Sequence, residues 1–466
     1  MRHPLRYVAR VTLQAETPFL IGSGEKDLMS DAGFAADANG LPALPGASIA
    51  GVLRHAFAAQ DSAAESDLFG CPEESGSRLM VSWGAIHDAS GHAVEGLLRA
   101  SRIQGDPVLR NAVESKIRDH VRIGHRGAAA DQGKFDQRCV AAGHRFTFEL
   151  MLEGSEADAA YWATLLGIIR SETFRLGGKT RAGLGRFTTG RIADRIFDLT
   201  NKADFAAFCS HPVSLAEGDA LSASEMVSTL RDEDAVVAEL SLAPEGFWMF
   251  GGGTDERVDM VPVSELRIAW DPKTGKGGVS KPEFYVPGSS VKGAIAHRTA
   301  FYHNVERGRF ADKGADLDAV SGTGNEAVRD LFGWIKGDLG RDTGRTEGQR
   351  GRVLIDDVFL GPVEQRPKKL VNHVSIDRFT GGARTLSGAL FSERPFFRGD
   401  PITLRLVIVE KTRISGAARR ALGRALKDLA TGRLTLGAGA GRGNGAFIAE
   451  GGVRWSDNGE WIGGDA

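Results

Sequence analysis

Residues 44–55 read LPGASIAGVLRH, and residues 286–297 repeat the pattern as VPGSSVKGAIAH. Each stretch is a tight Pro-Gly turn followed by serines that can cap a helix. In the first copy, Ile49, Leu53 and Phe57 recur at helical spacing, which predicts an amphipathic helix directly after the turn. The unpaired N–H groups at the start of such a helix suit a phosphate or a sugar–phosphate chain. One copy alone favours a capped core helix, whereas two copies call for a common explanation.

The rest of the chain repeats in the same order. An alternating strand followed by a Gly-rich turn opens each half, at 7–24 and at 236–253. After the predicted helix, both halves contain Asp-Leu-Phe-Gly, at 67–70 and at 330–333. The further matches are His-Val-x-Ile at 120–123 and 373–376, and the closing loops LGGKTRAGLGRF at 176–187 and LGAGAGRGNGAF at 436–447. Ordered self-similarity over both halves indicates tandem homologous domains.

We predict a first domain at 1–191, a helical connector at 192–234 and a second domain at 235–455. The second domain carries an insertion at about 304–349, rich in Gly, Asp and Arg, which is typical of a flexible excursion. A C-terminal tail follows at 456–466. Strands before and after two helices predict an α+β fold: two tandem ferredoxin-like domains, similar to RNA-recognition motifs, with inserted loops. Such a sheet is a common scaffold for single-stranded RNA.

Composition sets limits on function. The chain has 466 residues, and its formal net charge of −2 neither requires nor excludes nucleic acid. Three cysteines lie far apart with no pair at metal-ligand spacing, which argues against structural zinc and fits a reducing compartment. No apolar run reaches membrane-spanning length, and the first residues lack a signal-peptide core. We therefore predict a cytoplasmic protein without a membrane partner.

Nucleotide cofactors are excluded by motif spacing. Gly178-Lys179-Thr180 resembles the end of a P-loop, but that motif needs a glycine where this chain has Thr173. The glycines of 437–445 lack the dinucleotide-binding spacing. Glycine-rich loops with basic residues suit instead close approach to a nucleic-acid backbone. The alternative, an ordinary loop that packs two strands, is weakened because two such loops occur in register.

Acidic loops precede both Pro-Gly turns. Asp27, Asp31 and Asp37 lie before the first turn, and Asp255, Asp259, Glu265 and Asp271 lie before the second. A carboxylate beside a phosphodiester can hold a divalent cation or activate a 2′-hydroxyl. For each residue taken separately, a solvated loop acid is the alternative.

The combined motifs resemble those of the RAMP superfamily of CRISPR proteins. The matching stretches are IGSG, the Pro-Gly-x-Ser helix and GGKTRAGLGRF in the first half, with YVPGSSVKGAIAHR and HVSIDRFTGGARTLSGALF in the second. More narrowly, they are similar to the backbone subunit of type III interference complexes. The resemblance implies domains that stack along a guide RNA, each projecting a thumb-like loop that interrupts guide–target pairing at regular intervals.

The resemblance also implies a site. Cleaving subunits of that family carry an aspartate in the loop before the Pro-Gly turn, where it promotes metal-dependent cleavage of the target RNA. Asp31 fits this position in the first half and Asp259 in the second, with Glu265 as the competitor. Both aspartates are therefore the expected catalytic residues and ligands of Mg or Mn. The expected RNA-binding residues are Gly46, Ser48, Arg54, His125, Arg126, Lys179, Arg181, Arg186, Ser289, Ser290, Lys292, His297, Arg298, Arg378 and Arg442.

The expected partners are a guide RNA, a complementary target RNA and other type III subunits. Two alternatives stay open: a catalytically inactive scaffold of the same complex, and an endonuclease that processes guide RNA. The halves also differ, since Ala50 stands where the second half has Lys292. The sequence therefore leaves open whether both halves cleave.

Overall fold

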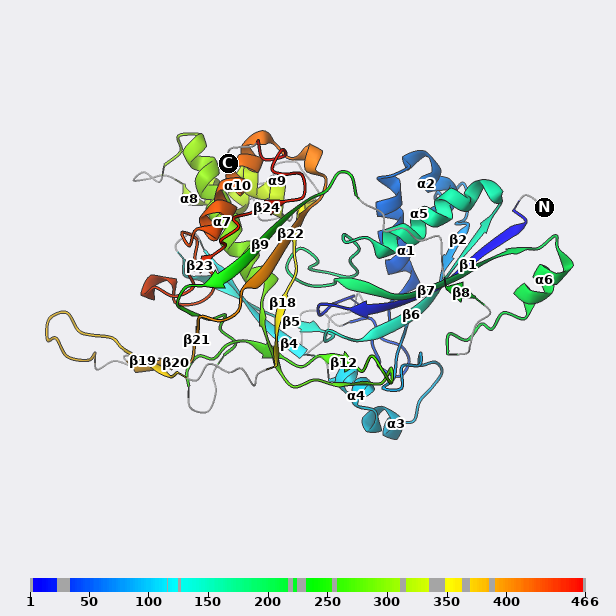
Figure 1. Cartoon of the computed structure of the whole chain (residues 1–466), viewed down its shortest axis with the longest axis horizontal. Coiled ribbons are helices and arrows are strands. Elements are labelled where there is room, and N and C mark those ends of the chain that lie inside the picture. The colour runs from blue at the N-terminus through cyan, green and yellow to red at the C-terminus, as the bar shows by residue number, and fades with distance from the viewer. Residues whose placement is uncertain are drawn as a thin grey trace.

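The structure is a computed structural model in which two lobes follow one another along the chain (Figure 1). The residues that it describes are 3–22, 34–114, 116–124, 127–216, 221–223, 232–253, 258–310, 316–334, 348–362, 369–384 and 390–463. Among these residues, no helix has the length and apolar character needed to cross a membrane.

The first lobe is an antiparallel sheet with helices on one face (Figure 1). Its strands, in sheet order, are β2 (Leu79–Val81), β6 (Arg145–Gly154), β1 (Leu5–Ala15), β7 (Phe187–Asp198) and β8 (Ser222–Ala223), with β3 (Ala85–Ile86) also on β6. Its covering helices are α1 (Gly46–Ala58), α2 (Ser62–Phe69) and α5 (Ala159–Arg170). Because β1 and β6 alternate inward and outward side chains, Val11 and Phe148 face each other in one core.

The second lobe repeats this order. Its sheet runs β17 (Val353–Ile355), β22 (Ile402–Ile408), β9 (Val236–Pro244) and β23 (Phe447–Ile448), with β24 (Arg454–Trp455) also on β9. Its helices are α7 (Gly288–Glu306), α9 (Glu326–Phe332) and α10 (Gly416–Ala430). In both sheets the first core strand lies between the third and the fourth, which is the ferredoxin-like order. The predicted α+β class and the tandem repeat are confirmed.

The remaining elements connect or extend the two sheets. The helices are α3 (Ala100–Gly105), α4 (Pro107–Val113), α6 (Lys202–Cys209) and α8 (Leu317–Val320). The strands are β4 (Lys116–Ile123), β5 (Ala129–Cys139), β10 (Phe247–Trp248), β11 (Ser264–Glu265), β12 (Ile268–Trp270), β13 (Gly277–Val279), β14 (Glu283–Val286), β15 (Gly333–Trp334), β16 (Gln349–Arg350), β18 (Val358–Pro362), β19 (Val371–Val374), β20 (Leu390–Glu393) and β21 (Phe396–Phe397).

Three segments differ from the sequence-based boundaries. Residue 191 falls inside β7, because this strand stays paired with β1 as far as Asp198. The tail expected from 456 includes Trp461 and Ile462, which are buried in the second core. Within the expected insertion, α9 places Leu331 in that same core. The parts of the insertion at 311–315 and 335–347 lie outside the described residues.

The predicted serine caps are wrong. Both helices begin at the glycine, with Pro45 and Pro287 at the N-cap position and no side-chain cap hydrogen bond. The glycine is needed for close approach instead. A Cβ on Gly46 would collide with the carbonyl oxygen of Val81, and one on Gly288 would lie 2.7 Å from that of Ile355. Each Pro-Gly turn therefore fastens its helix to the second core strand of its own sheet.

Candidate nucleic-acid interface

Each half projects a two-stranded hairpin where the sequence suggested only a loop. In the first half β4 pairs with β5, and in the second half β19 pairs with β20. Histidine and phenylalanine face each other across both hairpins. The rings of His120 and Phe135 stack with centroids 5.0 Å apart, and those of His373 and Phe391 stack at 4.6 Å. The matched His-Val-x-Ile motifs therefore mark a shared structural feature.

A cation from each closing Gly-rich loop completes this stack. The Lys179 Nζ lies 5.6 Å from the ring centroid of Phe135, and the Arg442 guanidinium lies 5.0 Å from that of Phe391. Lys179 reaches this position with a left-handed φ of 55°, which is uncommon for a residue other than glycine. Both lobes thus build the same histidine–phenylalanine–cation stack across the two strands of a hairpin.

The sequence identified the two cations but missed the two phenylalanines. The signal that could have found them is the paired strand: Phe135 and Phe391 lie directly opposite the matched histidines. In the second half the stack also rests on a buried carboxylate. Glu393 accepts hydrogen bonds from His373 at 2.9 Å and from Arg442 at 2.7 Å. Because of these bonds, the orientation of both side chains is fixed.

Asp259 lies at the base of the second hairpin. Its Oδ2 accepts the backbone N–H of Ser392 at 2.7 Å and the hydroxyl of the same residue at 3.0 Å. These two bonds hold the pKa of Asp259 below its ordinary value, so the carboxylate is charged at neutral pH. The side chain is exposed to solvent. The acid that the sequence singled out is therefore adjacent to the hairpin that carries the stack.

Glu265, the competing acid, has a different role. Its two carboxylate oxygens accept hydrogen bonds from Arg118 of the first half at 2.6 and 2.8 Å. The phenol of Tyr285 also donates to it, at 3.2 Å. The residue is buried, so this carboxylate joins the two lobes and does not face solvent. Of the two candidates in this loop, only Asp259 is open to a ligand.

Three further predicted residues, Asp31, His125 and Arg126, lie outside the described residues. Their expected roles stay predictions.

Cations from both halves meet at the junction of the lobes. Lys292, in the first turns of α7, lies close to Arg181 and Lys179 of the first half's Gly-rich loop. Burial lowers the pKa of Lys292 to about 8, and repulsion by those two cations adds to the shift. The Nζ donates to the carbonyl oxygen of Phe332 at 3.2 Å. The charged groups that shift this lysine are both cations, so a phosphate would relieve the repulsion among them.

Two arginines of the same loop also bind the other lobe. Arg181 is half-buried and donates to the carbonyl oxygen of Gly351 at 2.7 Å. Arg186 lies 3.3 Å from a carboxylate oxygen of Asp356, which Arg175 also contacts at 2.8 Å. The loop that the sequence assigned to RNA therefore faces two ways: Lys179 turns toward the hairpin, and the arginines turn toward the junction.

The start of α7 already holds an anion. The N–H of Gly288 donates to Oδ1 of the buried Asp357 at 2.8 Å, and Arg118 donates to the other oxygen at 2.6 Å. The phosphate expected at this helix start would compete with a protein carboxylate. In the first half, Gly46 is buried as well. The predicted phosphate contacts at the first helical N–H groups are thus contradicted in the second half.

The other predicted RNA ligands are spread over both lobes. Ser48, Ser289 and Ser290 lie in the first turns of α1 and α7, where Ser290 is exposed. Arg54 forms an ion pair with Glu65 on α2. The remaining three are His297, exposed on α7; Arg298, 3.3 Å from the buried Asp428 of α10; and Arg378, exposed in a turn between β19 and β20.

That turn also presents an aromatic ring that the sequence did not single out. The carboxylate of Asp377 accepts the N–H groups of Phe379 and Thr380 at 3.0 and 2.8 Å, which fixes a tight turn. Phe379 is 99% exposed and lies next to Arg378. A fully exposed phenyl ring beside a cation suits stacking on a nucleotide base.

The described residues supply no preformed metal cage. Nowhere among them do three His, Cys, Asp or Glu side chains converge on one point. A hydrated Mg²⁺ nevertheless needs only one or two protein carboxylates when phosphates provide the other oxygens. Asp259, charged and exposed, meets that requirement with one oxygen held by Ser392.

Comparisons with known proteins agree with the internal repeat. A family model described as the RAMP superfamily matches residues 12–188 and 273–448, one segment in each lobe. Among solved structures, a chain of the cryo-EM structure of the Type III-B Cmr-beta bound to cognate target RNA is similar at 15% identity, with a TM-score of 0.30. The match covers 41% of this chain and 60% of that chain, less than two thirds of the latter's length. No curated protein matches.

Proposed function

The chain belongs to the RAMP superfamily, and on this premise we propose that it is a guide-RNA-binding backbone subunit of a type III CRISPR effector complex. Its two halves would occupy neighbouring positions along one guide RNA. Complementary target RNA and other subunits of the complex would be its partners.

The junction cations carry this proposal. Lys179, Arg181 and Lys292 come together from both lobes. Burial lowers the pKa of Lys292, and repulsion by the other two cations lowers it further. A sugar–phosphate chain that runs from one lobe to the next would neutralise these charges. The repeated stacks at His120 and His373 would then flank that path, with one stack for each position along the guide.

Two helix glycines support the same path. Gly51 and Gly293 occupy equivalent positions inside α1 and α7, and a Cβ on either would meet no atom of the described residues within 4 Å. A glycine inside a helix costs about 0.5–1 kcal/mol relative to alanine. Because the fold itself does not require these glycines, we propose that an RNA backbone passes close to both helices.

We further propose that the second half cleaves target RNA beside Asp259. In-line attack of a 2′-hydroxyl on the adjacent phosphorus would break the bond to the 5′-oxygen. A carboxylate with a lowered pKa is a weak base, so Asp259 is better suited to hold a cation than to abstract the proton. A bound Mg or Mn ion would stabilise the charge that develops on the phosphate. Asp31 is proposed for the equivalent role in the first half.

The test is cleavage of a matched target RNA by the assembled ribonucleoprotein. Asp259→Asn should slow one set of cuts by about 100-fold or more, the loss typical of removing one electrostatic group, with guide and target binding intact. Asp271→Asn, an exposed acid from the same loop, is the matched control and should cut normally. Asp31→Asn should remove the other set of cuts, and chelation of divalent ions should remove both.

The scaffold alternative makes the opposite prediction. The two hydrogen bonds that Ser392 donates to Asp259 favour this alternative, because they give the carboxylate a role in holding the loop against the hairpin. If the Asp259→Asn and Asp31→Asn variants, and the double variant, all cut at the rate of the unchanged protein, the chain is a scaffold and the catalytic proposal is wrong. Cleavage of precursor RNA by the isolated chain without metal would instead identify a guide-processing enzyme.

A further inference from the structure

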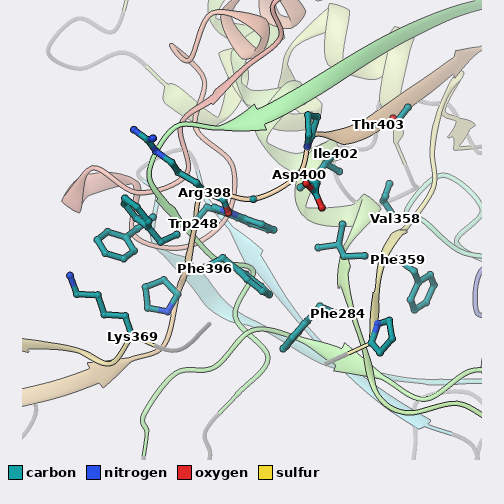
Figure 2. Close-up of a pocket in the computed structure, with 17 residues that line it drawn as sticks. Trp248, Phe284, Val358, Phe359, Lys369, Phe396, Arg398, Asp400, Ile402 and Thr403 are labelled. Atoms are coloured by element: carbon teal, nitrogen blue, oxygen red, sulfur yellow. The ribbon is translucent and has the colours of Figure 1, made fainter. Parts of the chain in front are cut away.

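The second lobe carries an aromatic cavity away from the junction cations. Its volume is about 830 Å³. Trp248, Phe284, Phe359 and Phe396 line it, with Lys369 and Arg398 among the polar side chains at its edge (Figure 2). Trp248 and Phe396 stack with centroids 4.6 Å apart, which fixes the floor. An apolar cavity of this size on a surface indicates a binding site for another molecule.

The internal repeat identifies the equivalent place on the first lobe. Gly46 lies against the carbonyl oxygen of Val81, and Gly288 lies against that of Ile355. Val81 and Ile355 are therefore equivalent positions of the second core strands. By this alignment, the cavity segment 358–362 corresponds to 84–88. The segment 398–403 corresponds to 142–147, and both contain a glycine with positive φ just before the third core strand.

On the first lobe this place is filled by the hairpin β12–β13 of the second lobe. The N–H of Ile268 donates to the carbonyl of Ala142 at 2.9 Å, and the Trp270 Nε1 donates to that of Gly143 at 2.7 Å. The Arg145 guanidinium lies 4.1 Å from the centroid of the Trp270 ring. The hairpin thus seats an indole against the first lobe and joins the two halves.

In the part of the chain that the structure describes, no element fills the equivalent surface of the second lobe. A Cβ on Gly143 would collide with Ile268, whereas one on Gly399 would meet none of the described atoms within 4 Å. The first lobe also has the helices α3 and α4 here, and α4 contacts β13 of the second lobe. In the second lobe only eight residues, 363–370, separate β18 from β19, which is fewer than α3 and α4 together contain.

We propose that this cavity receives an aromatic-tipped β-hairpin from the next subunit, as the first lobe receives β12–β13. This rests on the assembly part of the proposed function. A contact of this kind is heterologous, because the face that receives the hairpin differs from the face that presents it. The next subunit would therefore be added at the end of the chain formed by the second lobe.

The partner is a different chain, not a second copy. In this protein the loop that could present such a hairpin from the first half spans 23–44, which is shorter than 252–286. Its described turn is bound to its own lobe, since Asn39 contacts Gly96 and Leu98 at 2.9 and 2.8 Å. The β12–β13 hairpin is already used between the lobes. The occupant is therefore a related subunit with a long aromatic loop before its own Pro-Gly turn.

A photo-crosslinker tests this directly. p-Benzoylphenylalanine would replace Phe397, which lines the cavity and is 60% exposed, in the ribonucleoprotein assembled with its neighbouring subunits. We expect one dominant crosslink, mapped by mass spectrometry to a partner subunit, in the loop before that subunit's Pro-Gly turn. A crosslink to a second copy, to RNA or to another part of the partner would overturn the proposal, as would no crosslink.

A matched pair of variants gives the second readout. Phe397→Glu should lower the partner's stoichiometry at least tenfold, whereas Phe205→Glu, on α6 with 51% exposure, should leave it unchanged. Equal Tm values of the free chains would show that both variants fold. The amount of guide RNA in the same preparation distinguishes the two proposals. If Phe397→Glu retains both guide RNA and the partner subunit, only the docking proposal fails. If no guide co-purifies with the unchanged protein, the proposed function fails.

Discussion

Burial and two neighbouring cations together lower the pKa of Lys292. Its pKa of about 8 means that it is mostly charged at pH 7 and mostly neutral at pH 9. A bound phosphate would favour the charged form, so binding RNA above pH 8 requires the uptake of a proton. The affinity for guide RNA should therefore fall as the pH rises, by up to about tenfold per pH unit above 8.

Fluorescence anisotropy with a labelled guide RNA at constant salt measures this dependence between pH 7 and 9. Lys292→Arg keeps the charge throughout this range, and its affinity should stay constant. Parallel curves for the two proteins would contradict a contact between Lys292 and phosphate.

At this scale the sequence could predict which residue types matter but not which way they face. Lys179, Arg181 and Arg186 share one loop and were predicted to have one role. The structure turns Lys179 toward Phe135 and the two arginines toward the other lobe. The direction depends on positive-φ residues such as Gly183, and on contacts with a lobe about 170 positions away in sequence. Neither is encoded in the local pattern.

At the scale of the element, the two glycines of each Pro-Gly helix have opposite roles. Gly46→Ala should lower the free energy of unfolding by about 2 kcal/mol, because its Cβ would collide with the Val81 carbonyl. Gly51→Ala in the same helix should raise the free energy of unfolding by about 0.5–1 kcal/mol, because none of the described atoms lies within 4 Å of its Cβ. Urea unfolding of the free chain measures both.

Guide binding by Gly51→Ala shows whether this glycine serves RNA binding and not stability. Gly51→Ala should weaken guide binding even though it stabilises the chain, if the RNA backbone passes close to α1. A variant with higher stability and unchanged affinity would remove this glycine from the proposed path. Gly293→Ala in α7 repeats the test in the second half.

The order of elements could be predicted because the chain repeats it, and each copy supports the other. The hairpins and the helix starts could not. The strands β4 and β5 were missed because their exposed apolar residues, such as Ile117 and Val121, do not follow a core pattern. The serine caps failed because the N-cap position is held by proline, and the serines lie inside the first turn of each helix.

At the scale of the whole molecule, the two lobes are joined by contacts that the repeat does not contain. Arg118 of the first hairpin reaches Glu265 and Asp357, whereas the equivalent position of the second hairpin is Val371. The position equivalent to Asp357 in the first lobe is Trp83, which is 57% exposed. Comparison of the halves therefore predicts the shared fold but not their junction, where the two copies have diverged.

The buried cluster of Arg118, Glu265 and Asp357 should stabilise the junction of the two lobes. Arg118→Met leaves Glu265 and Asp357 buried without their cation, and should lower the free energy of unfolding by about 3–5 kcal/mol. Arg405→Met is the matched control, since its ion pair with Glu172 spans the same junction but is exposed, and it should cost less than about 1 kcal/mol. Burial raises the pKa of Asp357, and Arg118 opposes this shift.

Without Arg118, the folded-state pKa of Asp357 would rise further above its unfolded value, so the destabilisation would be full at high pH and would diminish as the pH falls through that raised pKa. Urea unfolding at pH 5.5 and pH 8 should therefore show a smaller loss for Arg118→Met at the lower pH, while Arg405→Met changes little. The triple variant Arg118→Met, Glu265→Gln, Asp357→Asn should regain part of the loss, because the uncompensated charges are gone. Equal losses for the two single variants at both pH values would mean that the buried cluster does not hold the lobes together.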